Sequence, residues 1–136
     1  MIDLTLELAD TVARAALTKA RELGVTISVS IVDESGRLVL CMRGNGLSFL
    51  TPEFAQAKAI AAVAFRKSTE ELAISREKFP AFWNTVPSIA SEPLLPAKGG
   101  VPLIVNGHVI GALGCSGASS DDDGECAMAG ASHLSP

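Results

Sequence analysis

Hydrophobic residues near the N-terminus follow the period of a helix. Alanine, valine and leucine recur at spacings of three and one between about Thr5 and Leu23, which places them in one stripe along a helix. Gly24 is expected to end this helix, because glycine readily takes the left-handed conformation in which helices commonly stop. An apolar stripe with a polar opposite side predicts a helix that covers a sheet.

Two hairpins are predicted from apolar or alternating runs joined by turn residues. In the segment TISVSIVD (26–33) apolar and polar residues alternate, and RLVLCMR (37–43) follows a turn that Asp33 and Gly36 favour. Residues 101–105 and 108–115 flank the pair Asn106-Gly107, which is typical of a two-residue type I′ turn. The chain therefore contains at least four strands in two antiparallel pairs.

Three further helices are predicted between and after these hairpins. Thr51 is expected to cap a helix with Pro52 at its first position, running through the alanine-rich segment EFAQAKAIAAVAF. Ser68-Thr69-Glu70-Glu71 has the spacing of a capping box and opens a shorter helix that ends before Pro80. A last helix begins near Ser119 or Ser120, and the acids at 121–123 and 125 are expected to cap it.

The segment from Pro80 to Gly100 is rich in proline and serine and predicts an ordered loop, with a short strand near Leu94 as the candidate fifth strand. The order of elements predicts one domain over residues 1–136. Its class is α/β (α+β), a single antiparallel sheet of about five strands flanked by helices.

Composition points to self-association and excludes two classes of partner. Hydrophobic residues make up 48% of the chain before its 12 glycines are added, whereas about 45–50% for both together is ordinary. This excess predicts a homo-oligomer, because no apolar run reaches the ~18 residues of a membrane span and the surplus must be buried against protein. A net charge of −4 with scattered cations argues against nucleic-acid binding.

Cysteine usage and the N-terminal segment predict a cytoplasmic location. The three cysteines, Cys41, Cys115 and Cys126, lack paired CxxC spacing and are expected to be reduced core thiols, with no metal site. The segment MIDLTLELAD has acids and no basic region before an apolar stretch, so no secretory signal is expected.

Three blocks of sequence together resemble a known family. They are IVDESGRLVLCMRGNG, AQAKAIAAVAFRKST and GGVPLIVNGHVIGALGCSGASSDDDGECAMAG. Their order and spacing are similar to those of the GlcG/HbpS family, also called the haem-degrading or DUF336 family. The resemblance implies a profilin-like fold, assembly into homo-oligomers and, in characterised relatives, binding of haem or a related tetrapyrrole. Other members sit beside catabolic enzymes.

The candidate ligand site combines cations with glycines. Gly111, Gly114 and Gly117 recur every three residues along the last strand, where glycine indicates close approach by a ligand, a helix or a neighbouring subunit. Arg43 and Lys58 could receive a carboxylate or propionate, or could form salt bridges with Asp33 or Glu53. The proposed ligand-binding residues are Arg43, Lys58, Gly99, Gly100, Gly114, Ser116 and Gly117, some of them through backbone N–H groups.

Other side chains are weaker candidates for ligand chemistry. His108 follows the type I′ turn and is the candidate haem ligand, although an exposed hairpin histidine is the alternative. Met42, Met128 and the cysteines could also bind iron, but their apolar surroundings predict core positions. Thr69 is expected to serve only as a helix cap.

Two functions of different classes follow. The first is a small-ligand-binding protein that takes haem or a related tetrapyrrole as its only cofactor. The second is an enzyme of a catabolic pathway, an isomerase, deaminase or hydratase acting on a small carboxylic acid. In that case Lys58 or Asp123 would be the catalytic acid or base, with Arg43 orienting the carboxylate. The sequence contains no Ser-His-Asp or Cys-His set that would favour nucleophilic hydrolysis.

Overall fold

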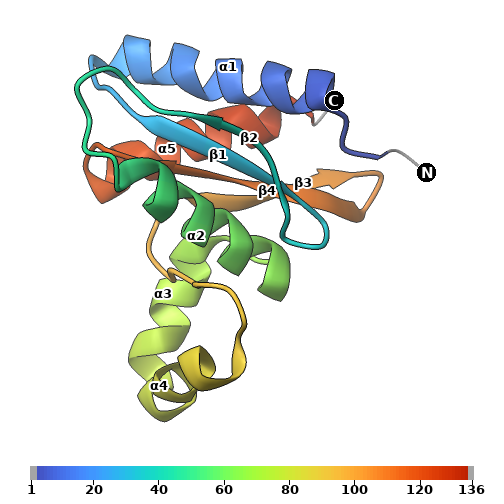
Figure 1. Ribbon diagram of the computed structural model, residues 1–136, viewed down its shortest axis with the longest axis vertical. Helices are drawn as coiled ribbons and strands as arrows, with labels where there is room; N and C mark the ends of the chain where they lie inside the picture. The colour runs from blue at the N-terminus through green and yellow to red at the C-terminus, as the bar shows by residue number, and fades with distance from the viewer. Residues whose placement is uncertain (1–2, 135–136) are drawn as a thin grey trace.

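The computed structural model describes residues 3–134, and Figure 1 shows how its elements are arranged. Helices and strands follow the order α-β-β-α-α-α-β-β-α. Their bounds are α1 Leu6–Leu23, β1 Ser28–Asp33, β2 Leu38–Met42, α2 Thr51–Phe65, α3 Thr69–Lys78, α4 Pro80–Ile89, β3 Gly100–Val105, β4 His108–Ser116 and α5 Ser120–Ser132.

The sheet has four antiparallel strands in the order β2-β1-β4-β3, so the expectation of about five strands is wrong. Within the described residues, no strand forms near Leu94. That segment carries Pro93 and Pro96, which have no N–H group to donate to a neighbouring strand. It is instead held to α2 by a hydrogen bond from the Leu95 N–H to the Ala57 carbonyl, 3.1 Å long.

The two hairpin turns and the end of α1 form where the sequence predicted them. Asn106 and Gly107 have φ angles of 51° and 79°, as a type I′ turn requires. Gly24 ends α1 with a left-handed φ of 72°. Asp33 Oδ1 accepts hydrogen bonds from the Ser35 and Arg37 N–H groups, 2.9 and 3.0 Å long, which closes the first hairpin.

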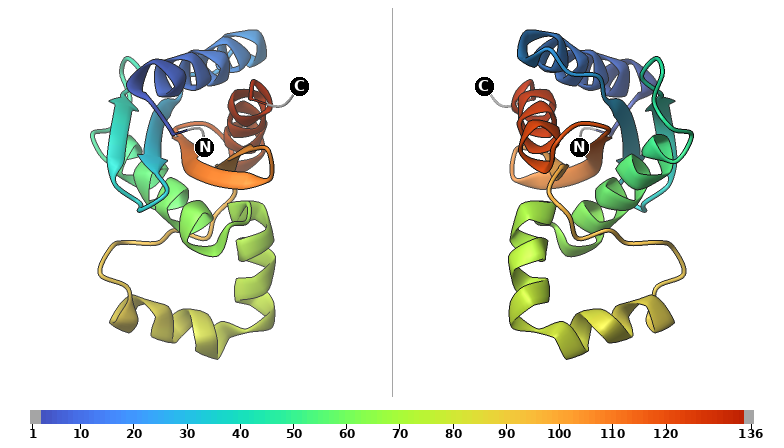
Figure 2. Two further views of the ribbon diagram at one scale, coloured as in Figure 1. Left: turned by 90° about the vertical axis from the view of Figure 1, so that its right-hand side faces the viewer. Right: turned by 90° about the vertical axis from the view of Figure 1, so that its left-hand side faces the viewer.

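Helices cover both faces of the sheet, as Figure 2 shows. On one face, α1 and α5 pack beside each other over the larger apolar core. That core is built from alternate residues of the strands and the apolar stripes of the two helices; its largest members are Ile27, Ile31, Leu103, Leu113, Val12 and Val29. On the other face lies α2.

The face beneath α2 is made of small residues, which lets the helix approach closely. A Cβ atom on Gly114 would overlap the carbonyl oxygen of Ala55 in α2. On the neighbouring strand, Ser30 Oγ donates to the Pro52 carbonyl at 3.0 Å. The close approach that the glycines of β4 predicted is therefore, at Gly114, an approach to helix backbone.

Thr51 does not cap α2 as expected. Leu50 occupies the N-cap position without a side-chain hydrogen bond, and the helix begins at Thr51. The Thr51 hydroxyl lies 2.8 Å from Ser28 Oγ and donates to the Ser48 carbonyl at 2.9 Å. The Thr51 hydroxyl therefore bonds to the sheet and to Ser48, and it does not cap the N-terminus of α2 as the local sequence predicted.

The segment predicted as a loop after Pro80 forms a helix, α4, for its first half. Pro80 stands at the start of this helix, where its missing N–H costs nothing. Trp83 anchors it, donating from Nε1 to Ser75 Oγ at 3.0 Å and packing at a tilt against Phe65 and edge-to-face against Phe82. Together α3 and α4 project from the sheet as an arm (Figures 1 and 2). Across residues 3–134, no helix combines the length and apolarity needed to cross a membrane.

Candidate functional site

A buried ion pair lies where α2, β4 and α5 meet. Lys58 Nζ is 3.3 Å from Asp123 Oδ2 and donates to the Cys115 carbonyl at 2.9 Å. The other oxygen, Asp123 Oδ1, accepts the Ala118 N–H at 3.0 Å. Lys58 and Asp123 are only 5% and 3% exposed. The cation and its carboxylate are thus satisfied by each other and by backbone groups.

The buried position of this pair changes the pKa of the Asp123 carboxyl. Burial raises the pKa of the Asp123 carboxyl above its ordinary value, and the nearby Lys58 ammonium and Ala118 N–H oppose that rise. Asp123 was expected to cap α5 together with its acidic neighbours. Ser119 caps the helix instead, accepting from the Asp122 N–H at 3.1 Å, and Asp123 turns inward to Lys58.

Gly99 and Gly100 form a thin backbone wall against the ion pair. Gly99 has a φ of 126°, and a Cβ atom there would lie 2.9 Å from Lys58 Nζ. The Gly100 N–H donates to Thr69 Oγ1 at 2.8 Å, and Thr69 Oγ1 lies 3.3 Å from the Gly100 carbonyl. The Gly100 N–H is therefore engaged by Thr69, which is fully buried and holds this wall, whereas Ser68 caps α3.

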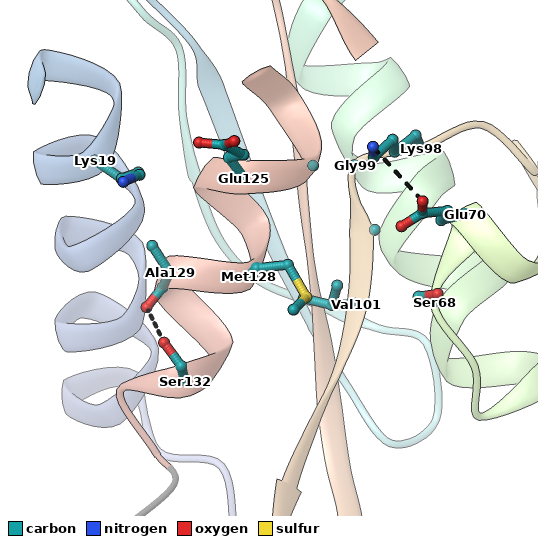
Figure 3. A pocket seen from close by; sticks show the side chains of 12 residues that line it. Lys19, Ser68, Glu70, Lys98, Gly99, Val101, Glu125, Met128, Ala129 and Ser132 are labelled. Atoms are coloured by element: carbon teal, nitrogen blue, oxygen red, sulfur yellow. Dashed lines mark hydrogen bonds and ion pairs between the residues drawn. The ribbon is translucent and has the colours of Figure 1, made fainter. Parts of the chain in front are cut away.

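A cavity of about 490 Å³ lies on the other side of this wall, between α5, the edge strand β3 and the start of α3 (Figure 3). Small and apolar residues form most of its surface, and charged side chains stand around it. The lining residues are Lys19, Ser68, Glu70, Lys98, Gly99, Gly100, Val101, Gly124, Glu125, Met128, Ala129 and Ser132.

Lys98 is the cation beside Gly99 at this cavity. Its Nζ lies 3.0 Å from Asp121 Oδ1 and 3.6 Å from Glu70 Oε1, so it joins the starts of α5 and α3. The hydrogen bond to Asp121 raises the pKa of Lys98 above its ordinary value. Its carbon chain lies over Gly124, where an added Cβ would be 2.8 Å from Lys98 Cε. Gly124 thereby leaves room for the lysine stem.

Met128 points into the cavity from α5 and is 62% exposed, so its predicted core position is wrong. The helical period explains the outcome. Ala127 and Gly130 face the core, whereas Glu125, Met128 and Ser132 share the side of α5 that lines the cavity. Sequence reasoning named Met128 as a possible iron ligand but placed it in the core, because the weak apolar pattern of α5 did not reveal which side faces the sheet.

The predicted site residues do not converge on a single place. Lys58, Asp123, Gly99 and Gly100 come together as described, and Ser116 ends β4 next to Cys115. Arg43 lines a separate cavity of about 340 Å³. A Cβ on Gly117 would lie 2.7 Å from Leu47 Cδ1. Leu47 Cδ1 is also 3.0 Å from the Cβ position of Gly44, the residue after Arg43, so Gly117 lies on the side of the molecule that carries Arg43.

The histidines also lie outside the cavity beside Gly99. His108 is exposed at the start of β4 and lines a different cavity together with Asp33 and Arg66. His108 and Ser116 are the first and last of the nine residues of β4, a span of roughly 27 Å for an extended strand. His133 lines another cavity again, between α1 and α5.

Neither a metal cluster nor a reactive buried thiol is present in the described part of the chain. Among residues 3–134, no three His, Cys, Asp or Glu side chains are grouped to hold a metal ion. Cys115 and Cys126 are buried, as expected, and burial raises the pKa of both thiols, that of Cys126 to about 11. Cys41 is exposed on the edge strand β2, so its expected core position is wrong.

The fold is similar to solved structures along its whole length. The crystal structure of HbpS matches with a TM-score of 0.88 and 34% identity, covering 100% of this chain and 93% of that chain. A crystal structure of a PduOC:haem complex matches with a TM-score of 0.87 and 28% identity, covering 98% of this chain and 96% of that chain.

Sequence comparison leads to the same group of proteins. The corrinoid adenosyltransferase PduO of Citrobacter freundii is 33% identical over 110 residues, which are 81% of this chain but 32% of PduO. The chain therefore corresponds to about a third of that enzyme. Residues 4–132 match the family model described as haem degrading protein HbpS-like. With this coverage by the family model and the agreement of the whole fold, the chain belongs to the HbpS-like family.

Proposed function

We propose that this chain binds haem or a related tetrapyrrole in the cavity between α5, β3 and the start of α3. The observation that carries the proposal is a cavity of about 490 Å³ with small apolar walls, which the ammonium groups of Lys19 and Lys98 line together with the carboxylates of Glu70 and Glu125. Sites for small molecules are commonly concave, of ~300–1,000 Å³, and apolar with a few placed polar groups. The relative crystallised as a PduOC:haem complex supports the choice of ligand.

The residues of the cavity fit the chemistry of haem. Val101, Ala129 and the backbone of Gly99 and Gly100 offer contacts to a flat apolar ring. Lys98 and Lys19 are suited to the ring's carboxylates, because an ammonium group attracts a propionate electrostatically. Bound haem would supply an iron centre capable of ligand exchange and electron transfer. The role of the chain's own side chains is to hold the ring and set the surroundings of its iron.

The alternative function, catalysis on a small carboxylic acid, has less support from the geometry. Lys58 and Asp123 lie behind the Gly99–Gly100 wall and are bonded to each other, so neither faces a cavity as an acid or base. Arg43, which was expected to orient the carboxylate of the substrate, lines another cavity. Binding therefore remains the function that the arrangement of residues favours.

Self-association forms a second part of the proposal. The arm formed by α3 and α4 presents several large apolar side chains to the surroundings: Ile74, Phe79, Phe82 and Ile89. Such a group on one projecting element is typical of a surface that binds protein, and the apolar excess of the whole chain favours a second copy as the partner.

Titration with hemin tests the ligand directly. The wild-type chain should give a saturable shift of the hemin absorption band. Ser132→Trp, which places a bulky ring at the edge of the cavity, should weaken it. Ser88→Trp on α4 is the matched control, a serine on an exposed helix position away from the cavity, and should bind like the wild type. No shift with the wild-type chain would reject haem binding and favour a small carboxylic acid as ligand.

A further inference from the structure

The side chain of Met128 is largely exposed and lines the cavity. It belongs to the cavity-lining side of α5, and its sulfur lies toward Val101 across the cavity (Figure 3). With 62% of its surface exposed, Met128 contrasts with its neighbours Cys126 and Ala127, which are fully buried. A long apolar side chain left open inside a cavity is available for contact with a ligand.

The donors lining the cavity can be compared as iron ligands. Its lining includes no imidazole and no thiol, because His108 and His133 line other cavities and Cys126 faces the core. The Lys98 ammonium is engaged by Asp121 and Glu70, and it is protonated, which leaves no lone pair for a metal. The carboxylates of Glu70 and Glu125 are hard donors at the charged rim. Met128 is the soft donor placed among the apolar walls.

Resting on the proposed haem binding, we propose that Met128 would hold the haem iron through its thioether sulfur. The sulfur is neutral at every pH, so it coordinates by donating a lone pair without losing a proton. In haem proteins, a methionine ligand raises the reduction potential of the iron. Met128 would thus bias the bound haem toward its reduced form, beyond merely retaining the ring.

Met128→Leu tests this role, because leucine preserves the apolar bulk and removes only the sulfur. The variant and the wild type are each saturated with hemin, and the absorption spectrum and reduction potential are measured. Met128→Leu should still bind hemin, lose the weak long-wavelength absorption of a sulfur–iron(III) bond and shift the potential downward. The matched control is Met42→Leu, which replaces the other methionine of residues 3–134. It should change neither the absorption spectrum nor the reduction potential.

A second substitution separates coordination from packing. Met128→His replaces the sulfur by an imidazole nitrogen and should restore a side-chain ligand, with a nitrogen-type spectrum in place of the sulfur-type one. Exposed Cys41 is replaced by serine in every variant, so that its thiol cannot supply a sulfur ligand. If hemin binds but Met128→Leu keeps the wild-type spectrum and potential, the assignment of Met128 is wrong while haem binding stands. If hemin does not bind the wild-type chain, both proposals fail.

Discussion

Lys58 Nζ lies 3.3 Å from the Asp123 carboxylate, and this contact joins two helices whose paired residues are 65 positions apart in the sequence. Lys58 comes from α2, on one face of the sheet, and Asp123 from α5, on the other. The pair meets beyond the buried end of β4, where Lys58 also binds the Cys115 carbonyl. The two layers of helices are therefore tied together directly behind the wall of the proposed haem cavity.

Removing one member of this pair should strongly destabilise the protein. Lys58→Met leaves the Asp123 carboxylate buried without its cation, and loss of one partner of a buried pair typically costs about 3–5 kcal/mol. The free energy of unfolding is measured with urea. Lys19→Met, which breaks the exposed pair with Glu22 at 3.8 Å, is the control and should cost no more than about 0.5 kcal/mol.

The double variant Lys58→Met/Asp123→Asn should be more stable than the sum of the two single losses predicts, because asparagine can still accept the Ala118 N–H and no charge remains unpaired. Additive losses would mean that the two side chains act independently.

A methyl group at position 114 should destabilise the fold through crowding. Gly114→Ala places a Cβ against the Ala55 carbonyl, and overpacking of this kind typically costs about 1–3 kcal/mol. Gly107→Ala is the comparison, because no atom lies within 4 Å of its Cβ position and only its φ of 79° opposes the substitution. Thermal unfolding should show the larger loss at 114. Equal losses would contradict a close helix contact.

The cations of the cavity, and not Arg43, should control the binding of hemin. Lys98→Met and Lys19→Met keep the apolar stems and remove the charges, so the affinity for hemin and its dependence on salt should both fall. Arg43→Met should leave both unchanged, because Arg43 lines another cavity. Weaker binding by Arg43→Met alone would move the site to the cavity that Arg43 lines.

Stability should fall as the pH rises above the ordinary pKa of a thiol. The unfolded chain releases the Cys126 proton near pH 9.0, whereas burial keeps the folded thiol protonated up to about 11. The contribution of Cys126 is therefore complete below pH 9.0 and is lost between 9.0 and about 11. Cys126→Ala should flatten the fall of the unfolding free energy in this range, and Cys41→Ala, at the exposed cysteine, should not.

The arm should control the oligomeric state. Light scattering at micromolar concentration is expected to give a mass above that of one 14.0 kDa chain. Phe79→Glu/Ile89→Glu should lower the mass, since it places two carboxylates among the exposed apolar side chains of the arm. Leu6→Glu, at an exposed leucine of α1, is the control. A monomeric wild type would reject self-association.

The amino-acid sequence alone determined the turns and helix ends that depend only on neighbouring residues. The turn at Asn106-Gly107, the end of α1 at Gly24 and the starts of α3 and α5 each depend on backbone preferences and hydrogen bonds within a few residues. The same local rules failed for α4, because its anchor is Trp83 packed against Phe65 of another helix. They also overestimated the sheet by one strand.

Only the tertiary structure decided which residues meet. Lys58 was expected either to receive a ligand carboxylate or to pair with Asp33 or Glu53, but packing α2 and α5 on opposite faces of the sheet brought it to Asp123. Thr69 became the support of the Gly99–Gly100 wall, and Met128 the sulfur in the cavity. Contacts of this kind depend on the rotation of each helix about its axis. That rotation is set by how closely small residues allow the helix to approach the sheet, a long-range property that no local pattern encodes.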